Sequence, residues 1–465
     1  MRFKICGLAF LAFLLLFNVS SSSTNAEMPT PAKPGLYHGP GSCAASSCHG
    51  NIQPQHQTRV LQNEFSTWIG QDKHANAYAV LSNPVSVRMG RILKTVNAQG
   101  QPAPPSEAPK CLACHALYAP DRHAQPFGLE DGVSCESCHG PSSGWLETHT
   151  HKDSHLDSVK YKEMVDLRDL KTRTTQCLTC HVGTADKWVD HEMIAAGHPD
   201  LMFEITYFSY RMPQHWQNHE GESPWRNVQA WGVGQAVQLR DSMYRLARRA
   251  GNSDKAWPEY AELDCYACHH SLTAAADSWR LVSSDYYGKR RPGNPPYNES
   301  RVIVFRDLVE ELHPDMAKQL NQDVWQVAEQ MNKLNGNRQE IAAAANRAAE
   351  LANQIADKLS AQSYDPALTL RLMRRIAANY PQIANAGYGA AAQAAMTLDD
   401  LSRAYQQNGG SEMSANLGSS IEALNKMFKE QNPSAYNAAQ FSDRMQNVSK
   451  ALGGRAAGAS ASGSN

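Results

Sequence analysis

The chain has 465 residues, with 44 Lys and Arg against 45 Asp and Glu and a formal net charge of −1. At about 150 residues per domain, this length predicts two or three domains. The basic residues form no stripe along the sequence, so nothing supports a nucleic-acid-binding protein.

Residues 1–26 have the pattern of a signal peptide. Arg2 and Lys4 supply a basic start, residues 7–19 are an apolar run, and small residues lead up to Ala26. The run is shorter than the roughly 20 residues that a membrane-spanning helix needs, and no later run approaches that length. We therefore expect no transmembrane anchor and a mature protein that is periplasmic or secreted.

A Pro/Gly-rich stretch at residues 27–40 predicts a surface arm, and residues 41–285 form the next predicted domain. Of the 11 cysteines, Cys6 lies in the leader and the other ten form five close pairs in this domain. The pairs are Cys43/Cys48, Cys111/Cys114, Cys135/Cys138, Cys177/Cys180 and Cys265/Cys268. A histidine follows each pair directly: His49, His115, His139, His181 and His269.

This pattern is typical of covalently bound haem c. Two cysteines three residues apart on a helical turn both reach the same porphyrin edge, and the adjoining histidine becomes the proximal iron ligand. The first pair has four intervening residues instead of two, and we expect the extra residues to bulge outward. Zinc ribbons and structural disulfides also use paired cysteines, but they do not require a histidine after every pair. The sequence therefore predicts five covalently bound haem c groups.

The second axial ligand of each iron must come from another part of the chain. The candidate distal histidines are His74, His198 and one of the cluster His149, His151 and His155, followed by the weaker candidates His191, His215, His219 and His270. A haem with two histidine ligands has no position for a substrate and only passes electrons. A haem without its sixth ligand binds and transforms a small molecule.

Helical patterns become long after the fourth motif. Residues 227–250 predict one helix with Arg245, Arg248 and Arg249 favourably placed at its C-terminal end. A predicted linker at 286–300 precedes an α-helical bundle at 301–452 and a disordered tail at 453–465. The predicted bundle helices are 323–334, 338–359, 366–378, 386–407, 414–429 and 434–452.

The order of motifs resembles the tetrahaem cytochrome c-554 family of electron carriers associated with hydroxylamine oxidation. The resemblance rests on Trp68, His74, Tyr78 and the string at 132–141, Gly-Val-Ser-Cys-Glu-Ser-Cys-His-Gly-Pro, and it extends over about residues 41–198. It implies a mainly α fold with short helices, long loops and stacked haem pairs. It also implies His74 and either His149 or His151 as distal ligands, and an open haem on His115.

The widened first motif, the fifth haem and the appended bundle depart from that family. We expect a carrier that moves electrons between a redox protein donor and an acceptor. The alternative is an enzyme whose open haem on His115 acts on small nitrogen oxides or hydroxylamine. The pentahaem nitrite reductases carry a lysine in place of one motif histidine, and no such motif occurs here. The bundle has two interpretations, a docking or oligomerisation surface and a stabilising cover.

Overall fold

The computed structural model describes residues 34–57, 60–125, 127–217, 221–254, 256–265, 268–269, 294–333, 335–410, 416–430 and 433–453. The predicted signal peptide, His219, His270, most of the predicted linker and nearly all of the predicted tail lie outside these residues. Within them the chain is mainly helical, and its only β pairings are isolated bridges. The predicted mainly α fold is confirmed.

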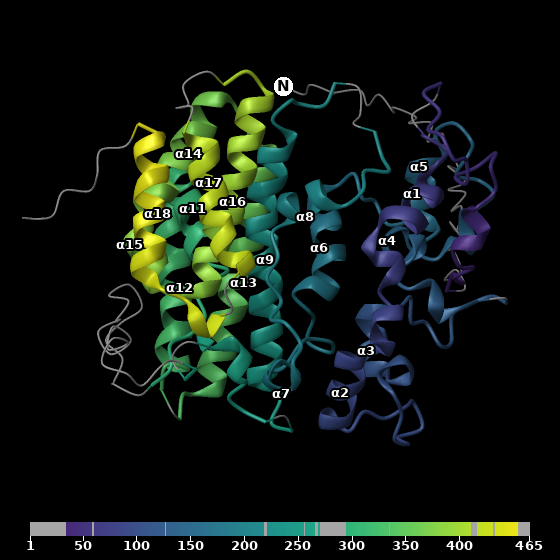
Figure 1. The fold of residues 1–465 in the computed structure, drawn as a ribbon, viewed down its shortest axis with the longest axis horizontal. Coiled ribbons are helices and arrows are strands. Elements are labelled where there is room, and N and C mark those ends of the chain that lie inside the picture. The colour runs from purple at the N-terminus through teal and green to yellow at the C-terminus, as the bar shows by residue number, and fades with distance from the viewer. Residues whose placement is uncertain are drawn as a thin grey trace, which may run out of the picture. The chain divides into compact units, whose positions relative to one another are not determined.

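Short helices and long loops make up the N-terminal half (Figure 1). In α2, for example, Asn83 caps the start by accepting the Ser86 N–H, and Lys94 ends the helix in a left-handed conformation. The helices are η1 (Pro40–Cys43), α1 (Glu64–Gln71), η2 (Lys73–Asn76), η3 (Ala79–Ser82), α2 (Pro84–Leu93), η4 (Pro105–Glu107), α3 (Pro109–His115), η5 (Leu129–Asp131), α4 (Cys135–His139), η6 (Ser142–Gly144), α5 (Ser154–Tyr161), α6 (Leu170–His181), α7 (His191–Ala196) and α8 (Ile205–Arg211).

Few apolar side chains pack together in this half. Its own cluster of buried residues consists of Leu81, Leu112 and Ala116. A side-chain core of this size does not hold so many loops in place, because folding must offset the entropy of ordering each residue. The arrangement is that of a fold whose interior is filled by cofactors.

The predicted helix at 227–250 is α9 (Arg226–Gly251), and it lies alongside α13 (Arg338–Ala361) (Figure 1). Val228, Val233 and Val237 of α9 are completely buried. The Trp231 indole N–H donates to Thr397 Oγ1 at 3.1 Å. A helix from the haem-motif half of the sequence is therefore buried against the C-terminal helices.

The C-terminal helices follow the sequence pattern with two corrections. The helix predicted to begin at residue 323 begins at Pro314, because proline suits the first helical position. Two helices, α11 and α15, were not predicted. The full set is α11 (Ile303–Leu312), α12 (Pro314–Met331), α13, α14 (Pro366–Ala378), α15 (Tyr380–Asn385), α16 (Tyr388–Gln407), α17 (Leu417–Glu430) and α18 (Ala438–Ala451), with short 3-10 turns η7 (Tyr260–Glu262) and η10 (Pro433–Ala435) beside them.

One apolar cluster runs from Leu170 in α6 to Leu452 after α18 and includes α8 and α9. The fourth haem motif therefore lies at the end of a helix, α6, whose buried residues belong to the same apolar core as the C-terminal helices. No helix among the described residues is long and apolar enough to cross a membrane.

Candidate cofactor centre

Three of the five motifs form the last turn of a helix. The helices α3, α4 and α6 end at His115, His139 and His181 respectively. Each histidine thus lies one turn from its two cysteines, as the predicted attachment chemistry requires.

The first motif accommodates its two extra residues in a turn. The Cys48 N–H donates to Ala45 O at 2.9 Å, and the His49 N–H donates to Cys43 O at 3.2 Å. The longer spacer therefore still returns His49 to the backbone of Cys43.

The first four motifs surround one cavity of about 1870 Å³. Pockets for a single small ligand or cofactor occupy about 300–1,000 Å³, so this space holds several large groups. The motif residues that line it are Cys43, Cys48, His49, Cys111, Cys114, His115, Cys135, Cys138, His139, Cys177, Cys180 and His181. The residues present fit covalently bound haem.

The fifth motif does not line that cavity. Its Cys268 and His269 are exposed, and Cys265 is half-buried. The local turn is nevertheless the expected one, because the N–H groups of Cys268 and His269 donate to Cys265 O at 3.2 and 2.8 Å.

The position of Cys268 has a physical reason. The fifth motif follows η7 in a loop after α9 rather than ending a helix that packs into the interior, so its second cysteine faces solvent. A thioether is a covalent bond and does not depend on burial of the sulfur. Attachment of a haem through Cys265 and Cys268 therefore stays a prediction, at a site on the surface rather than in the interior.

Contacts between thiols show which motifs are neighbours. The Cys43 and Cys135 thiols are hydrogen-bonding neighbours, and so are those of Cys114 and Cys180. Burial, followed by the nearby Cys177 thiol, raises the pKa of Cys138 to about 12. The first motif is thus next to the third, the second next to the fourth, and the third next to the fourth.

Four motif histidines each face a candidate distal histidine. Two imidazoles on opposite sides of one metal ion, each bound at about 2.0–2.1 Å, have ring centroids about 6.3 Å apart. The observed centroid separations are 6.2 Å for His49–His149, 6.0 Å for His74–His181, 6.3 Å for His115–His198 and 6.2 Å for His191–His269. All four agree with two axial ligands of one iron.

The remaining motif histidine, His139, shares the cavity with His215. Burial, followed by the charge of His215, lowers the pKa of His139 to about 4. Burial likewise lowers the pKa of His181 to about 4. Both imidazoles are therefore neutral at physiological pH, which is the form that binds metals.

The structure separates His149 from the two other histidines of its cluster. His149 is half-buried beside Trp145, with ring centroids 5.5 Å apart. His151 is exposed, and His155 lies 3.2 Å from Asp166. Among these three, His149 alone faces a motif histidine in the part of the chain that the structure describes.

The outer ring nitrogens have two kinds of partner. Carboxylates hold two of them: His49 Nδ1 lies 2.9 Å from Glu64 Oε2, and His74 Nδ1 lies 3.0 Å from Asp72 Oδ1. Backbone carbonyls hold four more: Ala77 O for His115, Leu146 O for His149, Pro199 O for His198 and Pro213 O for His215. Such contacts orient a ligating imidazole and leave its other nitrogen for the metal.

The carboxylate partners also change the proton affinity of the rings. The hydrogen bond that His49 donates to Glu64 raises the pKa of His49, and the bond that His74 donates to Asp72 raises the pKa of His74. Sequence reasoning did not select Glu64 or Asp72. Asp72 has a weak local signal because it lies two residues before His74 and caps η2, whereas Glu64 has no such signal.

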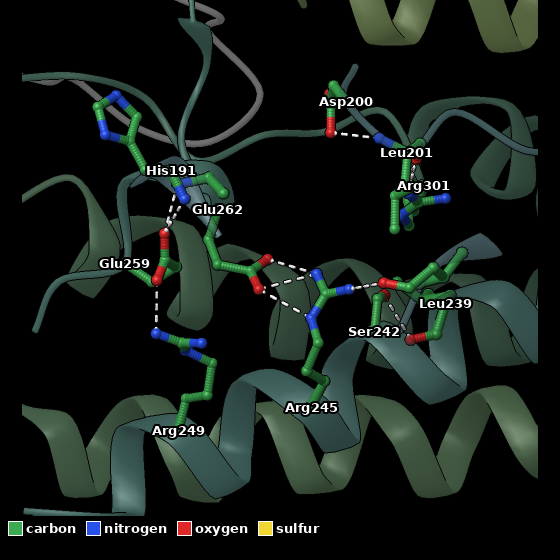
Figure 2. Close-up of polar contacts among 12 residues, drawn as sticks. His191, Asp200, Leu201, Leu239, Ser242, Arg245, Arg249, Glu259, Glu262 and Arg301 are labelled. Atoms are coloured by element: carbon green, nitrogen blue, oxygen red, sulfur yellow. Dashed lines mark hydrogen bonds and ion pairs between the residues drawn. The ribbon is translucent and has the colours of Figure 1, made fainter. Parts of the chain in front are cut away.

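His191 is held by a buried ionic network (Figure 2). Glu259 accepts the His191 backbone N–H at 2.9 Å and the Arg249 guanidinium at 2.5 Å. Beside it, Arg245 donates twice to Glu262, at 2.9 Å for each bond. The two arginines therefore anchor the loop after α9 to that helix, and Glu259 joins the loop to the start of α7, a role that the sequence pattern of a helix C-terminus does not predict.

No cluster of three or more His, Cys, Asp or Glu side chains could hold a bare metal ion among the described residues. Their histidines come in facing pairs instead. All ten motif cysteines are free of disulfide bonds.

Comparison with known proteins supports the motif pattern. Residues 43–140 match the protein family described as cytochrome c554 and c-prime. No curated protein matches the chain, and no solved structure matches it either. The matched segment contains the first three motifs and His74, and it ends one residue after the third motif.

Proposed function

We propose that this chain is a five-haem c-type cytochrome that carries electrons, and the match of residues 43–140 to the cytochrome c554 and c-prime family supports this proposal. It passes electrons between a donor and an acceptor redox protein, in the periplasm or outside the cell. Bound haem supplies the one-electron couple. The chain binds each group covalently, provides its axial ligands and sets its surroundings.

The facing pairs of histidines are the observation that carries this proposal. We assign His149, His198, His215, His74 and His191 as the distal ligands opposite His49, His115, His139, His181 and His269. Each iron then has two imidazoles and no position for a substrate, which favours electron transfer over catalysis.

The pair His115–His198 matters most for the choice between an electron carrier and an enzyme. The family resemblance implies an open haem on His115, where a small nitrogen compound would bind. The ring of His198 lies 6.3 Å from that of His115, and the Pro199 carbonyl, 2.8 Å from His198 Nδ1, orients it. This geometry supports six-coordinate iron and leaves the enzyme alternative without an open site.

The contacts between motifs support a linear order for the groups. Thiol neighbours connect the first motif to the third, the third to the fourth and the fourth to the second. The fifth motif is near the loop after His198: burial, then the charge of Asp200, raises the pKa of Cys265 to about 11. Electrons would then enter and leave at the first and fifth groups, with the second, third and fourth between them.

Exposure of the motif cysteines supports the same two ends. Cys48 of the first motif and Cys268 of the fifth are exposed, whereas the other motif cysteines are half-buried. The edges of the first and fifth groups would therefore be the ones that a redox partner approaches most closely.

Haem stoichiometry and spin state test the proposal. The full chain would be produced in a host with c-type haem maturation, and intact mass and electron paramagnetic resonance (EPR) of the oxidised protein would be measured. We expect a mass that includes five haems, cleavage after the signal peptide and low-spin signals alone. A high-spin signal that shifts on addition of nitrite or nitric oxide would instead support the enzyme.

A further inference from the structure

Two buried carboxyl groups meet at one hydroxyl where α8 packs against α16. Thr206 Oγ1 lies 2.8 Å from Glu204 Oε2 and 2.8 Å from Asp400 Oδ2. Glu204 is 0% exposed and Asp400 is 8% exposed. A hydroxyl has a single proton and donates it to only one of these oxygens, so the other carboxyl must carry a proton of its own. The pair therefore holds one proton.

The surroundings assign that proton to Asp400. Glu204 caps the start of α8 and accepts the backbone N–H groups of Thr206 at 3.2 Å and Tyr207 at 2.7 Å. Both oxygens of Glu204 thus already act as hydrogen-bond acceptors. Burial, followed by the charge of Glu204, raises the pKa of Asp400 well above its usual range.

The carboxyl pair borders the cofactor cavity. Thr206 and Asp400 line the cavity together with His181. Phe203, the residue before Glu204, stacks on His181 with ring centroids 4.8 Å apart and planes 23° apart. Because Asp400 and His181 line one cavity, a change of charge at the haem held by His181 would act on the pair electrostatically.

The two nearby arginines pair with a different carboxylate, that of Asp399. Arg211 of α8 and Arg403 of α16 donate to Asp399 Oδ2, at 3.1 and 3.0 Å. Their guanidinium groups also lie over the rings of Tyr207 and Tyr210, at 3.3 and 3.8 Å from the centroids. Both arginines thus mainly offset the charge of Asp399.

The start of α9 also approaches this part of the cavity. Its Trp231 indole donates to Thr397 Oγ1, one turn before Asp400. Its Arg226 guanidinium lies 3.6 Å from Glu222 and donates to Arg168 O at 2.7 Å. The Arg226 charge at the start of α9 is thus paired with Glu222 and with a backbone carbonyl.

We propose that Glu204 and Asp400 form a proton-binding site whose affinity depends on the redox state of the haem held by His181. The inference rests on the proposed function and adds proton uptake to electron transfer. At a pH high enough for the pair to lose its proton in the oxidised protein, one electron from the donor protein would convert ferric iron to ferrous. One proton from solvent would then bind the pair again, and the charge of the pair would change from −2 to −1. Oxidation reverses both steps.

The pH dependence of the haem midpoint potentials tests this link. In the wild-type holoprotein, one midpoint should fall as pH rises, by at most about 59 mV for each tenfold decrease in proton concentration. In Asp400→Asn the neutral amide replaces the protonated carboxyl. That midpoint should then stay constant at the value of the wild type's acidic plateau.

Asp307→Asn is the matched control. Asp307 of α11 is another buried carboxyl, at 3% exposure, and it does not line the cavity. Its replacement should leave the slope of the midpoint against pH unchanged. A slope lost equally in both variants would overturn the assignment to the pair.

The outcomes also separate this inference from the proposed function. Five low-spin haems with the same slope in wild type and Asp400→Asn would overturn the proton site and leave the carrier intact. A wild-type chain without covalent haem would overturn both. If Asp400→Asn does not fold, infrared difference spectra of the wild type decide: the carbonyl band of a protonated carboxyl must gain intensity on reduction, and an unchanged band overturns the proposal.

Discussion

At the scale of single residues, His198 determines whether the haem on His115 is open. We expect His198→Ala to convert one of five low-spin haems to high-spin, because the opposite ring at 6.3 Å is removed. The thioether bonds to Cys111 and Cys114 do not involve His198, so the haem count should not change. EPR and intact mass measure the two effects separately.

His151→Ala provides the control for that substitution. His151 is exposed, whereas its neighbour His149 faces His49. The variant should keep the wild-type EPR spectrum, and a new high-spin signal in it would show that the wrong histidine of this cluster has been assigned. An unchanged spectrum in His198→Ala would equally contradict the ligand pair at His115.

Glu64 should lower the midpoint potential of the haem on His49. Its carboxylate, 2.9 Å from His49 Nδ1, increases electron donation from the imidazole and stabilises the ferric state. We expect Glu64→Gln to raise that midpoint by up to about 59 mV, which corresponds to a tenfold change in the equilibrium between the ferric and ferrous states. Potentiometric titration followed by EPR measures this shift.

The haem on His115 is the internal reference for this experiment. His115 Nδ1 lies 2.9 Å from the Ala77 carbonyl rather than a carboxylate. Its midpoint should be the same in Glu64→Gln and wild type. Equal shifts at both haems would mean that Glu64 acts as a distant charge rather than through its hydrogen bond.

The motif residues were identifiable from sequence because they are close neighbours in the chain. The facing pairs were not, since His74 and His181 or His49 and His149 meet only after the chain has folded around the cavity. The carboxyl pair of Glu204 and Asp400 was invisible for the same reason. Each of these residues has an ordinary local context, and only tertiary contact distinguishes it.

The exposure of Cys268 was likewise hidden in the sequence. Its motif has the same spacing as that of Cys177 and Cys180, yet those two cysteines are half-buried and line the cavity. Spacing fixes how the two cysteines and the histidine lie relative to one another. It does not fix which way the motif faces, because that depends on the elements that pack around it.

At the scale of helices, periodicity predicted the amphipathic elements well. The predicted helices at 338–359 and 366–378 agree with α13 and α14 to within two residues. The helix α11 was missed because every residue from Ile303 to Val309 is buried, including Arg306 and Asp307. A helix buried on all sides has no polar face to create a period.

Alanines permit the close packing of α13. Ala345 is completely buried in the core, whereas Ala343 on the same helix is exposed. We expect Ala345→Leu to lower the free energy of unfolding by about 1–3 kcal/mol, because the larger side chain forces its neighbours apart. Ala343→Leu should change it by less than about 0.5 kcal/mol. Chemical denaturation of both variants measures the difference, and equal effects would contradict the packing.

Asp307 makes the stability of α11 depend on pH. Burial raises the pKa of its carboxyl to about 6, despite the two hydrogen bonds from Asn379 at 2.9 and 3.1 Å. The folded state thus binds the proton more tightly than the unfolded chain, whose Asp pKa is about 3.9. This contribution to stability is present below about pH 3.9 and is lost as pH rises to about 6, on the order of 3 kcal/mol in total.

Asp307→Asn removes that titration. The stability of the variant relative to wild type should therefore rise between about pH 4 and about 6 and then level off. Denaturation curves at several pH values measure this change. Parallel stability profiles for the two proteins would show that Asp307 keeps an ordinary pKa in the folded state.

At the scale of the whole molecule, the C-terminal helices share an apolar core with helices of the haem region. The helix α9 packs along α13, and one apolar cluster includes α6, α8, α9 and the helices after residue 301. Val233, Val237 and Leu246 of α9 are completely buried, and each such side chain contributes about 1.5–3 kcal/mol. Contacts of this kind favour a stabilising role for the predicted bundle over a detachable docking module.

A chain ending at residue 300 should therefore lose more than a partner-binding surface. Exposure of a few such α9 side chains lowers the free energy of unfolding by several kcal/mol. This is a large fraction of the roughly 5–15 kcal/mol by which a typical domain is stable. We expect the truncated protein to lose cooperative thermal unfolding. We also expect it to lose the low-spin signal of the haem on His181, whose helix α6 packs against α9. Thermal melts followed in the haem absorption bands and EPR measure the two losses.

Deletion of residues 454–465 alone is the control, because their small, polar composition predicts a disordered tail. That variant should melt like the full chain. A chain ending at 300 that stays monomeric, keeps every low-spin haem and unfolds cooperatively would reverse the assignment. The helices from α11 to α18 would then form an independently folded module. Its role would be to bind a partner protein or a second copy of the chain, rather than to stabilise the haem region.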